Sequence, residues 1–381
     1  MSPRISRRSA IAAAATGATG LALSSVEALA QPAFGGWGQQ LDVRVATLDA
    51  GLSRAAGGAL VAALHTRGDA RARKIAKIVQ INNPDILLLS GIDLDHDGAA
   101  LDLLRRNYLE VSQDGSTSVH YPYAYTGPGA ADPVAEAPAF PGQNGTAVLS
   151  RFPIRERDVR TFQRLPWRSM PSNLFPESHY GAEVGTTMPL SSTAHWDVPV
   201  TVGSSVIHLL VSRPVLPLED GPERRLARRN HDELRFWADY LTGGSRASWI
   251  RDDAGRAGGL EADASALVLG TLGTDPDSRI AWTGAAAQLL DHPRLQDTHP
   301  RSDGAMEAAA GPGTGTEAER TASFAPAPEG PGDLRVDYVL PTSDLDVIAS
   351  GVFWPRRGDS GAALLDATAH RLVRLDLRVD S

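Results

Sequence analysis

Short apolar segments recur along the chain and set the strongest limit on what it can fold into. They are rich in valine, isoleucine and leucine, and they lie near residues 43–48, 85–89, 146–150, 206–212, 266–269, 336–340 and 373–379. Segments of this length and composition are typical of β-strands. Several are almost continuously apolar, which is expected for inner strands that are covered on both faces. The sequence therefore predicts buried sheets.

One helix is predicted between the first two of these strands. Asp69 is a residue type that caps helix N-termini, and Ile75, Ile78 and Val79 follow it with helical spacing. The run Asn82-Asn83-Pro84 ends the pattern, because proline cannot continue a helix. We therefore expect an amphipathic helix that starts after Asp69 and stops at this run.

A second helix is predicted over about residues 223–241. Leu234, Trp237 and Leu241 fall on one face of it, and Gly243 follows as the expected C-cap. Four basic residues also belong to this segment: Arg224, Arg225, Arg228 and Arg229. We interpret them as a solvated face, with an anion-binding site as the alternative.

Strands and helices alternate here without a regular βαβ rhythm. This mixture fits an α+β fold, a four-layer α/β/β/α sandwich of two packed mixed sheets that carry outer helices. A parallel doubly wound sheet is the weaker interpretation. Residues 126–143 and 303–332 are rich in Gly, Ala and Pro without periodicity, so they are predicted to be surface loops. We expect one domain over residues 41–381.

The N-terminus has the pattern of a twin-arginine export signal. The run Ser6-Arg7-Arg8-Ser9-Ala10-Ile11 precedes an apolar stretch up to Leu23, and Ala28-Leu29-Ala30 is a small-residue cleavage pattern. We expect residues 1–30 to be the signal peptide, residues 31–40 a mature tail, and the location to be periplasmic or extracellular. An amphipathic helix and a membrane anchor are weaker interpretations. Two glycines interrupt the stretch, and it is shorter than the roughly 20 residues that span a bilayer.

Composition limits the partners. The formal net charge of −8 argues against non-specific binding to nucleic acid or anionic lipid. The absence of cysteine excludes disulfides and thiolate metal sites. We therefore expect neither a nucleic-acid partner nor membrane association after signal cleavage, and protein partners stay open.

Five stretches support a resemblance to a known family. They are Val43–Asp49, Pro84–Gly91, Gly145–Ile154, Leu267–Pro276 and Val336–Pro341. Their order resembles the endonuclease/exonuclease/phosphatase superfamily, whose fold is the deoxyribonuclease-I-like sandwich. Residues 191–200, 229–240 and 351–355 are similar to its exported bacterial alkaline-phosphatase-like branch. The resemblance covers nearly all of residues 41–381.

The resemblance implies a metal-dependent phosphoester hydrolase. This chemistry needs a metal to neutralise developing charge, a base that orients or deprotonates water, and donors for the phosphoryl oxygens. In the family these groups are an Asn after the first strand, a Glu after the second, and an Asp-x-Asn pair in a Gly-Asp-x-Asn turn. A mid-chain His, an Asp before a Tyr and a final Asp-His pair complete the set.

Most of the matching positions hold other residues in this chain. The first is Asp49, which can still bind a hard cation, and the second is Gly91, which has no side chain. The turn is Gly270-Thr271-Leu272-Gly273, without its carboxylate or its amide. The mid-chain His falls at Arg213, a cation that can hold a phosphate but cannot exchange protons at neutral pH.

The last positions are partly kept. Asp337 is followed by Tyr338 as in the family, and His370 remains although Ala369 stands in place of its acidic neighbour. The remnants Asp337 and His370, together with Asp49, do not make a complete site. Each loss of about 1.36 kcal/mol of transition-state stabilisation lowers the rate about tenfold.

Two weaker candidates for a site remain. Asp93, Asp95 and Asp97 alternate before a glycine, as in the first half of a calcium loop, but the twelfth position, which needs a bidentate Glu, is Leu104. A site for calcium or another hard cation is weighed here against a solvated acidic turn. His195 is a weak catalytic candidate because its segment is family-like, although isolated histidines near tryptophan are more often packed or surface groups.

The leading hypothesis is an exported protein with this fold that has lost, or nearly lost, metal-dependent hydrolysis and binds a phosphate-containing or other ligand. The alternative is an active phosphodiesterase or phosphatase whose rearranged site is built from Asp49, Asp93, His195, Asp337 and His370, with Mg or Ca as its cofactor. A structural or partner protein that uses an unrelated surface is the third hypothesis.

Overall fold

The computed structural model describes residues 40–129, 139–218, 220–309 and 315–380. The predicted signal peptide lies outside the described residues, and so does the predicted tail except for Gln40, which begins the first strand. The described residues all belong to one compact unit. Within the described residues, no helix combines the length and the apolar character needed to cross a membrane.

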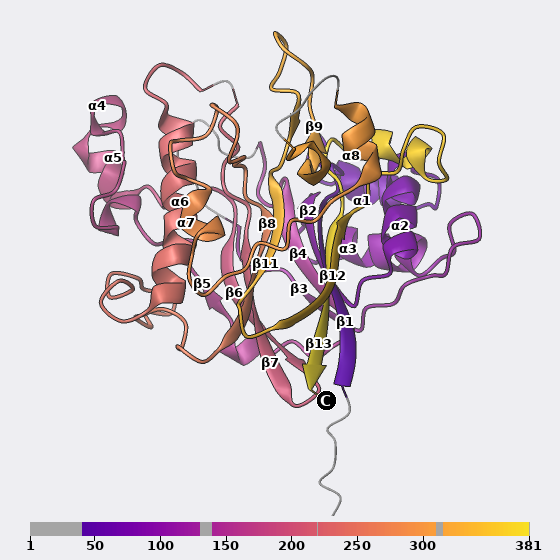
Figure 1. Ribbon diagram of the computed structural model, residues 1–381, viewed down its shortest axis with the longest axis horizontal. Coiled ribbons are helices and arrows are strands. Elements are labelled where there is room, and N and C mark those ends of the chain that lie inside the picture. The colour runs from indigo at the N-terminus through magenta and orange to yellow at the C-terminus, as the bar shows by residue number, and fades with distance from the viewer. Residues whose placement is uncertain (1–39, 130–138, 219, 310–314, 381) are drawn as a thin grey trace, which may run out of the picture. The chain divides into compact units, whose positions relative to one another are not determined.

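The first sheet has the strand order β12-β13-β1-β2-β4-β3 (Figure 1). Its strands are β1 (Gln40–Asp49), β2 (Ile86–Ile92), β3 (Tyr123–Tyr125), β4 (Gly145–Ser150), β12 (Asp346–Val352) and β13 (Val373–Asp380). β1 is parallel to β2, whereas the other neighbouring pairs are antiparallel. The first and last strands of the unit, β1 and β13, are therefore direct neighbours.

The second sheet has the strand order β11-β8-β7-β6-β5. Its strands are β5 (Arg160–Thr161), β6 (His195–Val202), β7 (Ser205–Ser212), β8 (Ser265–Thr271) and β11 (Asp337–Pro341). Only the pair β7 and β8 is parallel among these described strands. A small separate ladder joins β9 (Ala322–Ser323) and β10 (Asp333–Leu334).

An apolar layer between the sheets forms the centre of the fold. Val43 and Leu375 from the first sheet and Val198 and Leu267 from the second are buried in the same cluster. Helices cover the outer faces (Figure 1). Beside the first sheet lie α1 (Ala59–Leu64), α2 (Ala70–Asn82) and α3 (Ala99–Leu104), and beside the second lies α6 (Arg225–Thr242). The prediction of an α+β fold with two packed mixed sheets and outer helices is confirmed.

The two predicted helices are present. α2 (Ala70–Asn82) starts where the Asp69 carboxylate accepts a hydrogen bond from the Ala72 amide at 2.8 Å, and it stops at Asn83, whose φ is +47°. α6 (Arg225–Thr242) buries Leu234, Trp237 and Leu241 and ends at Gly243.

The remaining helical segments are short. The α-helices are α1 (Ala59–Leu64), α3 (Ala99–Leu104), α4 (Glu177–Tyr180), α5 (Ala182–Thr187), α7 (Ala287–Leu290) and α8 (Asp303–Ala308). The other turns of helix are η1 (Arg105–Leu109), η2 (Glu156–Asp158), η3 (Trp167–Ser169), η4 (Glu317–Glu319) and η5 (Ala362–Ala367).

Two expectations about local structure are wrong in part. The segment 303–332 is not a continuous loop, because α8 forms at its start and the Ser302 hydroxyl accepts a hydrogen bond from the Ala305 amide. The arginines of α6 do not all form a solvated face. Arg229 is only 2% exposed and donates hydrogen bonds to the carbonyl oxygens of Pro189, Leu190 and Ser191.

Candidate active-site edge

The ends of several strands bring the surviving site residues to one edge of the two sheets. Asp49 is the last residue of β1, and Arg213 follows the last residue of β7. Thr271 ends β8 and pairs in register with Asp337, the first residue of the antiparallel strand β11. His370 precedes β13, which runs antiparallel to β1. Because parallel neighbours end at the same edge, residues distant in sequence converge there.

Asp337 and His370 form a buried pair. The His370 Nδ1 atom lies 3.1 Å from Asp337 Oδ1 and 3.0 Å from Oδ2. The Thr271 hydroxyl donates to Asp337 Oδ1 at 2.6 Å. The Thr321 hydroxyl accepts from the Asp337 amide at 2.9 Å. The carboxylate thus orients the imidazole, as the resemblance implies.

Asp49 is held by Arg213 instead of being free to bind a metal. The Asp49 Oδ2 atom accepts from Arg213 Nε at 3.0 Å and from Nη2 at 2.8 Å, and Asp49 Oδ1 accepts from the Gly51 amide at 3.2 Å. Thr368 ties this pair to the other one, since its hydroxyl donates to the Asp49 carbonyl and accepts from the His370 amide. The three survivors Asp49, Asp337 and His370 therefore do converge.

The charges of this group shift one another's pKa. Burial raises the pKa of Asp49, but Arg213 and then His370 outweigh burial, so the net pKa lies below its ordinary value. Burial lowers the pKa of His370, but Asp337 and Asp49 outweigh burial, so the net pKa lies above its ordinary value. The edge therefore favours a carboxylate at Asp49 and a cationic imidazole at His370.

Gly91 leaves no room for the carboxylate that the resemblance expects at its position. Its φ is +70°, a region that L-residues with a side chain rarely adopt. A Cβ atom built there would lie 2.1 Å from Asp49 Oδ1. The Asp49 side chain therefore fills the space that a side chain at position 91 would need.

The other vacated turn is closed by a neighbour from α6. Gly273 has a φ of +66°, and a Cβ atom there would lie 3.1 Å from Asn230 Nδ2. The Asn230 amide donates to the carbonyl oxygens of Val215 and Leu272 at 2.8 and 2.9 Å. Asn230 thus lies beside position 273, where the family has an asparagine, but its amide group is used for hydrogen bonds to the main chain.

These contacts do not suit a divalent cation at this edge. Both Asp49 oxygens already accept hydrogen bonds, one of them from a guanidinium, and Gly91 supplies no ligand. A hard cation needs several oxygen ligands around it. The weak expectation that Arg213 binds phosphate also loses support, because its guanidinium is paired with Asp49.

Asn144 adds a further contact to Arg213. Its amide is assigned with the oxygen toward Arg213, where it accepts from Nη1 at 3.0 Å and from Nη2 at 3.3 Å. The Asp93 carboxylate accepts from the Asn144 amide nitrogen of the main chain at 3.0 Å and from the Ser53 hydroxyl at 2.6 Å. Sequence reasoning missed Asn144. The signal was its place directly before the family-like stretch that begins at Gly145.

Asp93, Asp95 and Asp97 do not act together as a calcium loop. Asp93 is buried among the contacts just described, whereas the Asp95 carboxylate accepts from the amides of Ala99 and Ala100 at the start of α3. The Asp97 side chain is 90% exposed. The sequence pattern therefore reflects two backbone-capping roles and one solvated carboxylate.

His195 lies in the core and not in the group around His370. It is 1% exposed, its Nδ1 atom lies 3.1 Å from the Ser191 hydroxyl, and its Nε2 atom lies 3.2 Å from the Glu233 carbonyl oxygen. Its ring stacks on Trp237. Burial lowers the pKa of His195 to about 4, so the ring is neutral at physiological pH.

Glu233 is a buried carboxylate that sequence reasoning missed. It accepts from the Ser192 amide at 2.6 Å and from the Val215 amide at 2.9 Å, and it is 0% exposed. Burial raises its pKa to about 7, and Arg229 only partly opposes this shift. Glu233 thereby holds the segment before β6, at Ser192, together with the segment after β7, at Val215.

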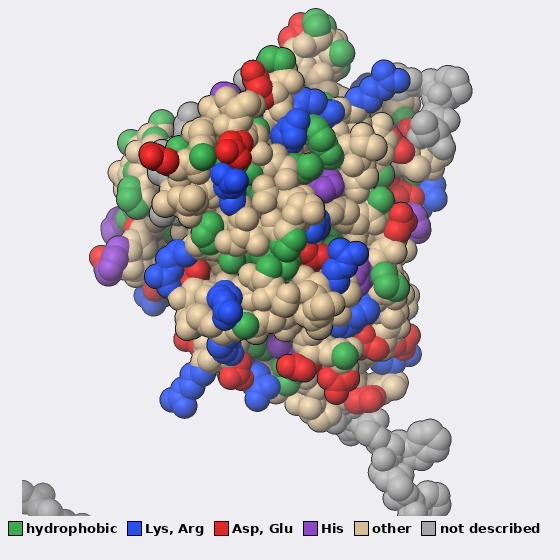
Figure 2. Space-filling view, turned by 90° about the vertical axis from the view of Figure 1, so that its left-hand side faces the viewer, with side chains coloured by type: hydrophobic (Ala, Val, Ile, Leu, Met, Phe, Trp, Pro, Cys, Tyr) green, Lys and Arg blue, Asp and Glu red, His purple; other side chains and the backbone are tan. Residues whose placement is uncertain are grey.

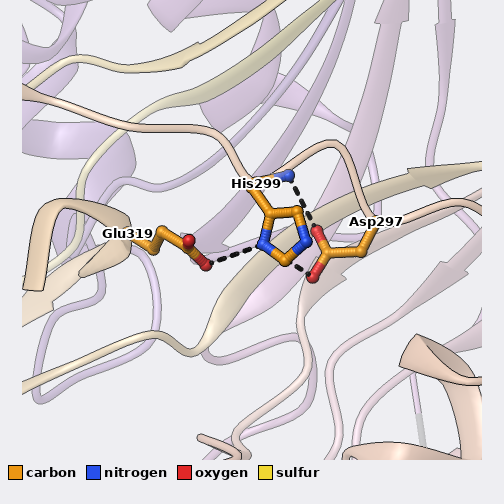
Figure 3. Close-up of side chains that lie close together, drawn as sticks. All are labelled: Asp297, His299 and Glu319. Atoms are coloured by element: carbon orange, nitrogen blue, oxygen red, sulfur yellow. Dashed lines mark hydrogen bonds and ion pairs between the residues drawn. The ribbon is translucent and has the colours of Figure 1, made fainter. Parts of the chain in front are cut away.

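A second group of charged residues makes its own, separate set of contacts. Asp297, His299 and Glu319 place ligand atoms within 4.8 Å of one another, and Figure 3 shows His299 between the two carboxylates. The Arg335 guanidinium donates to both Asp297 oxygens at 2.8 and 2.6 Å and to Glu319 at 2.9 Å. Among the described residues this is the group that could hold a metal, but the Arg335 cation already pairs with both of its carboxylates.

Comparisons with known proteins agree with this architecture. The model of the Endonuclease/Exonuclease/phosphatase family matches residues 58–366. No curated protein sequence matches the chain. A solved endonuclease/exonuclease/phosphatase from Beutenbergia cavernae is similar with a TM-score of 0.53 and 19% identity, covering 89% of this chain and 72% of that one.

Two further solved structures are more distant. A family protein from Leptotrichia buccalis has a TM-score of 0.49 and 11% identity, covering 88% of this chain and 99% of that one. One from Bacteroides thetaiotaomicron has a TM-score of 0.47 and 12% identity, with coverages of 90% and 97%. The matched family model spans most of the described strands and helices. The chain therefore belongs to the endonuclease/exonuclease/phosphatase family, whose members are generally metal-dependent.

Proposed function

We propose that this protein is an exported member of the family that binds a ligand at the sheet edge and does not hydrolyse phosphoesters. The observation that carries the proposal is the two-bond contact between Arg213 and Asp49. It places a fixed cation on the carboxylate that would otherwise ligate a metal. Gly91 and Thr271 add no further acid to this edge.

The proton chemistry of the edge supports the same proposal. His370 retains its partner Asp337. Burial lowers the pKa of this imidazole, but Asp337 and Asp49 outweigh burial and raise it above its ordinary value, which favours the cationic form. Thr271 has no carboxylate with which to activate water. The surviving pair can hold and orient a polar ligand through the imidazole.

Surface charge supports a small ligand rather than nucleic acid. The formal net charge is −8, and on the face shown in Figure 2 basic and acidic side chains are interspersed. Nucleic-acid sites instead gather Lys and Arg on one face or stripe.

The test is an assay for turnover. The purified chain is incubated with Mg²⁺, Mn²⁺ or Ca²⁺ and either bis(p-nitrophenyl) phosphate or p-nitrophenyl phosphate. We expect the same background rate for the wild type and for Asp337→Asn, a variant that keeps the shape of the buried side chain. Thermal unfolding shows whether each variant is folded.

Two outcomes would favour an active enzyme instead. Metal-dependent turnover that Asp337→Asn abolishes would establish a working site at the sheet edge. Turnover that survives this change but is lost in His299→Gln would locate catalysis at the group of Asp297, His299 and Glu319. Asp359→Asn, which changes an exposed carboxylate, is the matched control for both.

A further inference from the structure

A cavity of about 350 Å³ opens beside Asn144 at the same edge of the sheets. Ligand sites in proteins commonly have volumes of about 300–1,000 Å³. Its lining includes residues before and within β4 and residues before and within β6. The cavity reaches Arg213 through Asn144, whose side chain contacts that guanidinium.

The polar side chains that line the cavity are neutral throughout the part of the chain that the structure describes. They carry hydroxyl or amide groups: Ser53, Gln143, Asn144, Thr146, Ser192 and Thr193. Hydroxyl groups both donate and accept hydrogen bonds, and amides offer both kinds of atom as well. Trp196 and Leu94 add apolar surface to the same wall.

The nearest charges are already used within the protein. Arg213 is paired with Asp49, and Asp93 accepts from the Ser53 hydroxyl and from the main-chain amides of Arg54 and Asn144. A phosphate in the cavity would find no unpaired cation among the described lining residues. Burying a charge without a partner is costly, so a neutral ligand fits this lining better.

The lining is also held in place before any ligand arrives. The Trp196 indole donates to the Pro128 carbonyl oxygen at 3.3 Å. A Cβ atom at Gly127 would come 2.5 Å from the same ring, so backbone and indole pack closely. Glu233 fixes Ser192 through its amide. A wall fixed in this way loses little conformational freedom on binding.

We propose that this cavity binds a neutral, hydroxyl-rich small molecule, a sugar or a polyol. The proposal rests on the proposed function, because it names the ligand class for binding without hydrolysis at this edge. The hydroxyl groups of such a ligand match the hydroxyl and amide groups of the wall. Its C–H surface matches Trp196 and Leu94.

Isothermal titration of the full chain tests the ligand class. The neutral probes are glucose, galactose, mannose, trehalose and myo-inositol, and the charged probes are glucose 6-phosphate and inorganic phosphate. We expect at least one neutral probe to bind, and both charged probes to bind at least tenfold more weakly than that probe. Binding of a hexose or of trehalose would identify the ligand as a sugar. Binding of myo-inositol alone would identify it as a polyol.

Variants locate the binding. Thr193→Phe, which fills the cavity, should lower the affinity for the neutral probe at least tenfold, and Thr193→Val, which removes only a hydroxyl, should lower it less. Thr117→Phe makes the same change at an exposed position away from the cavity and should leave the affinity unchanged. Unfolding temperatures within a few degrees of the wild type show that the variants are folded.

Failure of this inference can be told apart from failure of the proposed function. Binding of no probe, tighter binding of a charged probe, or neutral binding that Thr193→Phe leaves unchanged would overturn the neutral-ligand proposal. Phosphoester turnover would overturn the proposed function whatever the titrations show. Absence of turnover together with a Thr193-dependent sugar affinity would support both.

Discussion

Gly91 and Gly115 both lie in the left-handed region, at φ values of +70° and +84°, but only Gly91 is crowded. A Cβ atom at Gly91 would meet Asp49 Oδ1 at 2.1 Å, whereas nothing lies within 4 Å of one at Gly115. Gly115→Ala should lower the free energy of unfolding by about 1 kcal/mol through backbone strain alone. Gly91→Ala should cost about 3 kcal/mol, because overlap adds about 2 kcal/mol to that strain. Urea unfolding measures both, and equal losses would contradict the crowding.

At the scale of single residues, the sequence shows which candidate site residues are kept, but it does not show which residues they contact. Asp337 and His370 could be predicted as a pair, because the resemblance assigns both, and the structure places them 3.0 Å apart. The pairing of Arg213 with Asp49 could not, since 164 positions separate them and neither residue signals its partner. The same limit applies to His195, whose family-like segment predicted a role in catalysis although its two nitrogens bond within the core.

At the scale of elements, His195 connects strand β6 to helix α6. Its pKa is about 4 in the folded protein and about 6.5 when unfolded, because burial penalises the charged ring. Above pH 6.5 the ring is neutral in both states and has no effect on stability. As the pH falls from 6.5 to 4, only the unfolded chain takes up the proton, so the folded state should lose about 3 kcal/mol.

Chemical denaturation between pH 7.5 and pH 4 checks this expectation. His195→Gln should lose less stability than the wild type over this range, because the variant lacks the titrating ring. His65→Gln removes an exposed histidine and should follow the wild-type curve. Parallel curves for the wild type and His195→Gln would show that His195 takes up its proton as easily in the core as in water.

The elements that the sequence predicted best carry strong local signals. The start of α2 follows from Asp69 and its end from Asn83 and Pro84, so both bounds are fixed within a few residues. Strand β6 was not predicted, because its apolar residues alternate with His195, Asp197 and Pro199 and do not form one of the continuous apolar runs from which the strands were predicted. The polar groups of His195 and Asp197 are satisfied by tertiary contacts, such as the bonds from His208 and Tyr240 to Asp197, which no local pattern can show.

At the scale of the whole molecule, two ion pairs join the sheets at one edge, Arg213–Asp49 and His370–Asp337. Arg213 follows β7 of the second sheet and holds Asp49 of β1 in the first, with side chains that are 20% and 5% exposed. Arg213→Ala leaves the Asp49 carboxylate buried without its cation and should cost about 3 kcal/mol of unfolding free energy. The exposed pair of Lys74 and Asp366 is the matched control, and Lys74→Ala should cost less than about 1 kcal/mol.

The pH dependence of this loss gives a second check. Without Arg213 the pKa of Asp49 should rise, because burial then has less opposition. A raised carboxyl pKa makes stability fall as the pH rises, so the defect should be larger at pH 8 than at pH 4.5. Arg213→Ala combined with Asp49→Asn should recover part of the loss, and an additive double variant would show that the two residues are not coupled.

The crowding at Gly91 also limits which mutational routes are open to this protein. A side chain at position 91 and the present Asp49 carboxylate, which Arg213 holds in place, compete for one space, since even a Cβ atom there would meet Asp49. A change at position 91 alone therefore produces a variant that is less stable than the present protein. Loss of Arg213 alone leaves a buried charge and is also unfavourable. A return to an acidic edge therefore has to pass through destabilised single variants or change several positions together, which makes the present arrangement hard to reverse one step at a time.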